Sequence, residues 1–173
     1  MIRRFNRDDK GATAVEFALI AIPLVSLIFA ALQTSIIFVF DQALQTATQK
    51  AARQLMTGSA QTSNLTKDQF KSIVCANLPS QFNCANLLVD VEASSSFSTV
   101  STSPVTLTYN PDGTVSNAAA LSYNPGNPGD IVIMRAMYDW PVLGGPLGVG
   151  LANQPDGGRL MIATAVFKNE PYQ

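Results

Sequence analysis

The pattern of hydrophobic and polar positions changes along this chain. It begins, near the N-terminus, with a long apolar run. Residues 17–40 hold one strongly polar side chain, Gln33. A helix rises 1.5 Å per residue, so the run exceeds the roughly 20 residues that a hydrocarbon core of about 30 Å requires. We therefore predict a transmembrane helix over residues 12–40, preceded by a leader at residues 1–11.

After residue 40 the apolar positions become periodic. The stretch "DQALQTATQKAARQLM" has apolar or small residues at helical spacing, at positions 43, 44, 47, 51, 52 and 55. It predicts an amphipathic helical stalk over residues 41–57, ended by Gly58. Residues 59–65 read as a polar loop. Thr66 and Gln69 then form a capping-box pattern, which predicts a short helix that ends before Pro79.

The remaining patterns predict strands. Alternating or continuous apolar residues indicate strands at 87–93, 105–109, 130–140 and 159–170, and the last ends in "NEPY", where Pro171 stops the ladder. The Ser/Thr-rich segment from residue 94 fits an exposed edge strand or a loop. The predicted class is α+β: a long N-terminal transmembrane and stalk helix, followed by a domain (residues 58–173) with one short helix and a 3–4-stranded antiparallel sheet.

The charged residues that precede the apolar run indicate how the helix is oriented in the membrane. Four basic residues precede the apolar run, which favours a cytoplasmic leader and an exported domain: Arg3, Arg4, Arg7 and Lys10. A cleaved secretory signal peptide is the alternative, although its apolar core should span only about 7–15 residues. The net charge of −1 provides no basic patch, so we expect no nucleic-acid partner.

Candidate chemistry is sparse. The chain has no histidine, the usual general base and zinc ligand, so we expect no catalytic residue, no metal site, no cofactor and no small-molecule substrate. Asp90 and Glu92 share one strand face and could mimic a carboxylate pair, but a solvated face explains them better. "NPDGT" (110–114) and "GGPLGVG" (144–150) lack the partners of a calcium loop or a phosphate cradle.

The two cysteines, Cys75 and Cys84, predict one disulfide if the domain is exported. Closing so short a loop stabilises a domain by roughly 2–3 kcal/mol on the chain-entropy model. A pair of buried free thiols is the alternative.

One carboxylate stands inside the apolar segment. In "KGATAVEFAL", Gly11 is followed by four residues and then by Glu16 and Phe17, where the basic leader meets the hydrophobic helix. This arrangement resembles the processing site of the tight-adherence (Tad, or Flp-type) branch of type IV pilins. Residues 8–56 and 130–172 are similar to TadE-like proteins, pseudopilins of the Tad system.

The resemblance implies a bacterial inner-membrane protein with its N-terminus in the cytoplasm and its domain in the periplasm or the pilus. A prepilin-type peptidase would cut between Gly11 and Ala12, and other pilin or pseudopilin subunits would be partners. The new ammonium of Ala12 lies one helical turn before Glu16, so the two could form an ion pair within or between subunits. The helix dipole also favours a carboxylate there.

The resemblance implies a minor pilin-like or pseudopilin-like structural protein, and the sparse candidate chemistry predicts no enzyme. The alternative is an unprocessed, single-pass anchored protein whose periplasmic domain binds an envelope partner or ligand. In that case Glu16 is an ordinary boundary residue whose carboxylate reaches the headgroups.

Overall fold

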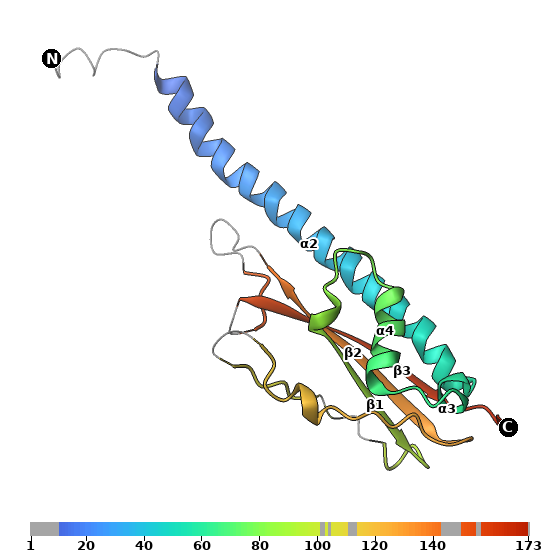
Figure 1. The fold of residues 1–173 in the computed structure, drawn as a ribbon. Coiled ribbons are helices and arrows are strands. Elements are labelled where there is room, and N and C mark those ends of the chain that lie inside the picture. The colour runs from blue at the N-terminus through green and yellow to red at the C-terminus, as the bar shows by residue number, and fades with distance from the viewer. Residues whose placement is uncertain are drawn as a thin grey trace. The chain divides into compact units, whose positions relative to one another are not determined.

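The computed structural model describes residues 11–100, 103, 105–110, 114–142, 150–154 and 157–172. Its elements follow one another in an α+β order, as predicted (Figure 1): α2 (Ala12–Met56), α3 (Ser59–Thr62), α4 (Lys67–Ala76), β1 (Leu87–Ser94), β2 (Ile131–Pro141) and β3 (Gly158–Lys168). Two short 3₁₀ turns lie at Cys84–Asn86 and Ala118–Ala120. Contacts divide the chain into two compact units, residues 1–38 with 143–151 and residues 39–142 with 152–173.

Helix α2 continues without interruption to Met56, as the periodicity of residues 41–56 predicts. One face of this part is buried in the second unit: Leu44, Ala47, Thr48, Ala51, Ala52 and Leu55. The helix ends where Gly58 adopts a left-handed conformation with φ of 77°. A Cβ at this position would overlap the ring of Tyr172, so Gly58 is required by both its backbone and its neighbour.

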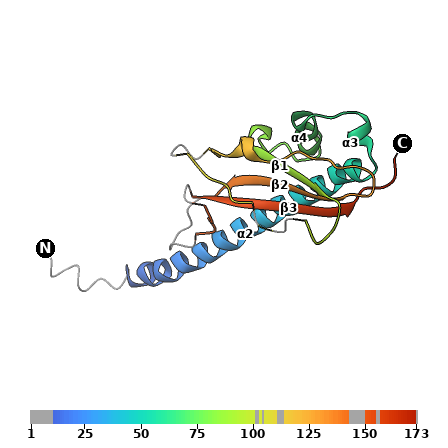
Figure 2. The same ribbon diagram turned by 90° about the horizontal axis from the view of Figure 1, so that it is seen from below.

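Strands β1, β2 and β3 form an antiparallel sheet in that order, side by side in Figure 2. Alternate residues of each strand face the helices, so Val89, Met134 and Ala163 join Leu44 of α2 and Phe70 of α4 in one hydrophobic core. Helix α4 begins with the predicted capping box, in which Thr66 and Gln69 satisfy each other's backbone N–H groups.

Two local predictions are wrong. Residues 105–109 form no ladder strand; among the described residues they contribute one bridge, between Tyr109 and Val115. The side chain of Asn117 forms hydrogen bonds with backbone groups of this segment in place of a neighbouring strand. It accepts a hydrogen bond from the N–H of Thr108 and donates one to the carbonyl of Thr106. The predicted polar loop at 59–65 contains the short helix α3.

Some predictions concern residues outside those that the structure describes. They are the basic leader up to Lys10, the middle of "NPDGT" (111–113) and the glycine-rich stretch 144–149.

Candidate functional site: the start of the apolar helix

The predicted processing junction lies where helix α2 begins. Gly11 directly precedes the helix and is exposed, and a Cβ added to it would meet no atom within 4 Å. Ala12 is the first helical residue, and Glu16 follows one turn later on the same uninterrupted helix. The side chains of Glu16 and Phe17 are both exposed. The backbone thus places the two members of the predicted ion pair at i and i+4.

The helix after this junction is apolar on every side. Large hydrophobic side chains with 38% or more of their surface exposed are Val15, Phe17, Leu19, Ile20, Ile22, Leu24, Val25, Leu27, Ile28, Phe29, Leu32, Ile36, Phe38 and Val39. By length and composition, α2 is a candidate membrane span. A helix that is hydrophobic all round requires lipid or other apolar helices around it.

Hydroxyl groups inside this apolar segment satisfy themselves within the helix. Ser26 donates to the carbonyl of Ile22 at 2.8 Å, and Ser35 donates to that of Ala31 at 2.8 Å. Such bonds let serine lie at membrane depth without an unsatisfied polar group. Pro23 lies within the helix and removes one backbone donor, yet α2 continues on both sides of it.

Cys75 and Cys84 form a disulfide in the structure, with 5.8 Å between their Cα atoms. This separation is ordinary for a disulfide. Cys75 lies near the end of α4, and Cys84 lies three residues before β1. The bond therefore ties the covering helix to the first strand of the sheet.

The carboxylates Asp90 and Glu92 are not the solvated strand face that we expected. Asp90 is only 2% exposed, and its Oδ2 accepts a hydrogen bond from Nη1 of the buried Arg135 at 2.9 Å. Its Oδ1 accepts the backbone N–H of Ser122 at 2.8 Å. Glu92 lies 3.8 Å from the same guanidinium but remains partly exposed. Asp90 thus holds β1, β2 and the returning segment together.

The C-terminal "NEPY" is more than the end of a strand. Asn169 and Tyr172 both donate hydrogen bonds to carbonyl oxygens of the 125–127 turn, at 2.9–3.1 Å. The backbone N–H of Glu170 donates to the carbonyl of Met56, at the end of α2. The C-terminal segment therefore connects the end of α2 to this turn. The two stretches that make this contact are recognisable in the sequence, "NEPY" as a strand end and "YNPGNPGD" (123–130) as a turn. Nothing in either stretch predicts that they contact each other.

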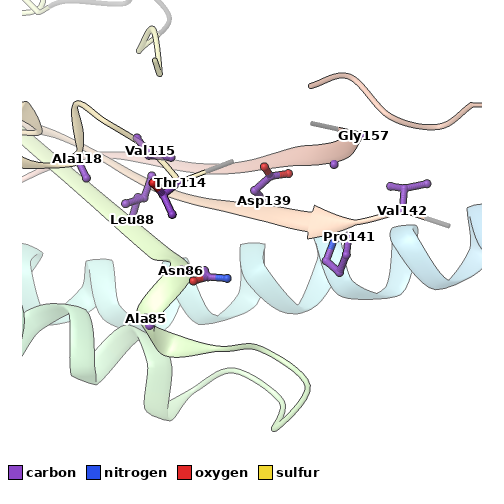
Figure 3. A pocket seen from close by; sticks show the side chains of 11 residues that line it. Ala85, Asn86, Leu88, Thr114, Val115, Ala118, Asp139, Pro141, Val142 and Gly157 are labelled. Atoms are coloured by element: carbon purple, nitrogen blue, oxygen red, sulfur yellow. The ribbon is translucent and has the colours of Figure 1, made fainter. Parts of the chain in front are cut away.

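The domain also has a shallow hollow of about 570 Å³ between the strand ends and the Ala118–Ala120 turn (Figure 3). Eleven residues line it, and one of them, Asp139, is ionisable. A single carboxylate does not make an acid–base pair. Within the described part of the chain, no three acidic or cysteine side chains gather as a metal site would require.

Comparison with known proteins gives one result for the helix. Residues 11–53 match the family model described as "TadE-like protein". The match begins at the predicted scissile glycine and ends three residues before the end of α2, so it does not extend to the similarity that we noted at residues 130–172. No curated protein and no solved structure matches the chain.

Proposed function

Because residues 11–53 are similar to the TadE-like family, which supports a part in Tad pilus assembly, we propose that this chain is a minor pilin-like or pseudopilin-like subunit of that system. The chain is inserted with its leader in the cytoplasm and its domain on the outer side of the bacterial inner membrane. A prepilin-type peptidase removes residues 1–11. The subunit then associates with other pilin or pseudopilin subunits through residues 12–40.

One observation carries this proposal: a helix whose large apolar side chains are mostly exposed has a carboxylate, Glu16, one turn after its first residue. An unpaired charge deep in the membrane costs about 2.5–3.5 kcal/mol on insertion scales. Cleavage after Gly11 creates an ammonium on Ala12, on the same helix face. Glu16 is then neutralised by its own amine or by that of a neighbouring subunit, and the apolar faces become free to pack together.

In this proposal the helix mediates association with other subunits, and the domain is the folded, exported part of the subunit. The disulfide, the Asp90–Arg135 ion pair and the C-terminal hydrogen bonds all lie in the second compact unit. We propose that this unit caps, initiates or regulates the filament while the helix holds it there.

The test is the N-terminal mass of the chain isolated from its native membranes. We expect a start at Ala12 in the natural chain and at Met1 in Gly11→Ala. Gly150→Ala is the matched control, since a Cβ meets nothing within 4 Å at either glycine, and it should still start at Ala12.

Each other outcome has a clear meaning. A start at Met1 in the natural chain would leave an uncut membrane anchor and overturn the pseudopilin proposal. A start well beyond residue 30 would indicate a secretory signal peptide. If cleavage occurs, Glu16→Gln should lower the incorporation of the subunit into assemblies; in an uncut anchor the same change should have little effect.

A further inference from the structure

Four aromatic side chains gather at one end of the domain: Phe40, Phe82, Tyr138 and Trp140. The rings of Phe40 and Trp140 stack with their centroids 4.1 Å apart and an interplanar angle of 25°. Phe82 contacts Tyr138 edge-on at 4.7 Å and Phe40 at 5.6 Å. These spacings are typical of aromatic pairs that stabilise beyond their buried area alone. The cluster therefore fixes the end of β2 against α2.

The cluster coincides with the end of the apolar run. Phe40 is its last residue, and Asp41 carries the first charge after Glu16. Val39, one residue earlier, is 62% exposed, so the helix surface is still apolar there. If the run spans the hydrocarbon as proposed above, Phe40 marks the level at which the helix leaves it.

Trp140 must lie close to that level. Its ring centre is 4.1 Å from that of Phe40, which is less than one helical turn of 5.4 Å. Trp140 is only partly buried, and Pro141, the next residue, is exposed. Within the described residues the indole N–H of Trp140 has no hydrogen-bond acceptor, and it is not among the buried polar atoms.

We propose that this end of the domain lies in the headgroup layer of the outer surface of the membrane, where Trp140 contacts phospholipid. An indole has an apolar body and one donor, and it prefers the interface, where acyl chains meet ester and phosphate oxygens. Those oxygens supply the acceptor that the described residues lack. This inference rests on the proposed membrane span and goes beyond it, since a span alone does not require the domain to touch lipid.

The chain is suited to a direct test because Trp140 is its only tryptophan. The full chain is reconstituted in phosphatidylcholine–phosphatidylglycerol vesicles that contain lipids brominated at shallow (6,7) or deep (11,12) acyl positions. Bromine quenches indole emission at short range. We expect quenching of Trp140 emission, stronger with the shallow label than with the deep one.

Two matched variants provide the scale. Trp140→Phe combined with Phe29→Trp moves the indole near the middle of the apolar run, where the deep label should quench it at least as strongly as the shallow one. Trp140→Phe combined with Phe97→Trp moves it to an exposed site beyond Ser94, at the opposite end of β1, where neither label should quench it. Phenylalanine at 140 keeps a ring against Phe40.

The outcomes separate this proposal from the proposed function. Quenching at position 29 without quenching of Trp140 would overturn the lipid contact and leave the membrane span intact. Stronger quenching of Trp140 by the deep label would place it in the hydrocarbon, which also contradicts a headgroup position. Absence of quenching at both positions would overturn the span itself, and the inference with it.

Discussion

The two halves of helix α2 share one backbone and differ in what surrounds them. In residues 12–40 most large apolar side chains stay exposed, as Leu32 does at 58%, although Ile37 is buried at 8%. In residues 41–56 the apolar face is buried by the chain's own sheet, and Leu44 is 0% exposed. The same secondary structure therefore presents a surface for other molecules in one half and completes a hydrophobic core in the other.

The difference follows from the spacing of apolar residues. A sheet can cover one face of a helix, so residues 41–56 need a single apolar stripe, and Ala47 and Ala51 within it let the backbones approach closely. An all-apolar helix cannot be covered by one sheet. Residues 12–40 thus leave their remaining surface to lipid or to neighbouring helices, which is what assembly by lateral packing requires.

The largest expected effect on stability comes from breaking the buried ion pair between Asp90 and Arg135. Asp90→Ala leaves the buried guanidinium of Arg135 without its closest carboxylate, so we expect a loss of about 3–5 kcal/mol in the free energy of unfolding. The measurement is urea unfolding of the full chain in detergent micelles, followed by Trp140 fluorescence.

Two control variants sharpen that comparison. Glu92→Ala removes the more exposed partner of the same guanidinium and should cost about 0–1 kcal/mol. Glu16→Ala lies in the exposed half of the helix and should leave this unfolding transition unchanged. Equal losses for Asp90→Ala and Glu92→Ala would contradict the role that we assign to Asp90.

A leucine pair tests the two halves of the helix directly. Leu44→Ala opens a cavity in the core and should destabilise the domain by about 2–5 kcal/mol, measured by the same urea unfolding. Leu32→Ala removes the same atoms from an exposed position and should have almost no effect on that transition. A comparable loss for both variants would show that residues 12–40 belong to the cooperative unit of the domain.

Local patterns predicted most of the fold. The apolar run and the period of residues 41–56 gave α2, the Thr66–Gln69 box gave the start of α4, and alternation gave three strands within two residues of their observed ends. Each of these signals depends on neighbours along the chain. They succeed because an amphipathic helix or strand must bury its apolar face, whatever covers it.

The errors concern contacts between distant segments. Asp90 looked solvated because its strand face points away from the core, whereas its register partner Arg135 and the backbone of Ser122 enclose it. Residues 105–109 have the composition of a strand but no ladder partner in the described structure, so Asn117 satisfies them instead. The motif of the predicted processing site is visible in the sequence, and the structure adds that it lies at the start of helix α2. Cleavage itself stays a prediction.

The disulfide gives an intermediate effect that belongs to the packed region alone. Replacing both Cys75 and Cys84 by Ser should lower the free energy of unfolding by roughly 2–3 kcal/mol, since the unfolded chain regains the freedom of the closed loop. Natural protein treated with a reductant should unfold like the double variant. Equal stability of the natural chain and the variant under oxidising conditions would instead indicate free thiols.

The smallest expected effect is a pH dependence centred on Tyr123. Its ring lies 5.6 Å from that of Phe70, and burial raises the pKa of its hydroxyl above the ordinary value of about 10. The unfolded chain therefore ionises first as the pH rises. The stability contributed by neutral Tyr123 is complete below about pH 10 and is lost as the pH passes through the raised pKa of the folded state.

Tyr123→Phe isolates this contribution, because Tyr172, whose pKa is also raised, remains in both chains. Within the described residues the Tyr123 hydroxyl has no hydrogen-bond partner, so we expect the variant to match the natural chain at pH 7 or to be slightly more stable. Between about pH 9 and pH 11 its urea midpoint should fall less steeply than that of the natural chain. Parallel slopes would mean that the hydroxyl ionises as easily in the folded domain as in water. The helicity of residues 12–40 should not follow this titration, since these residues contain no tyrosine.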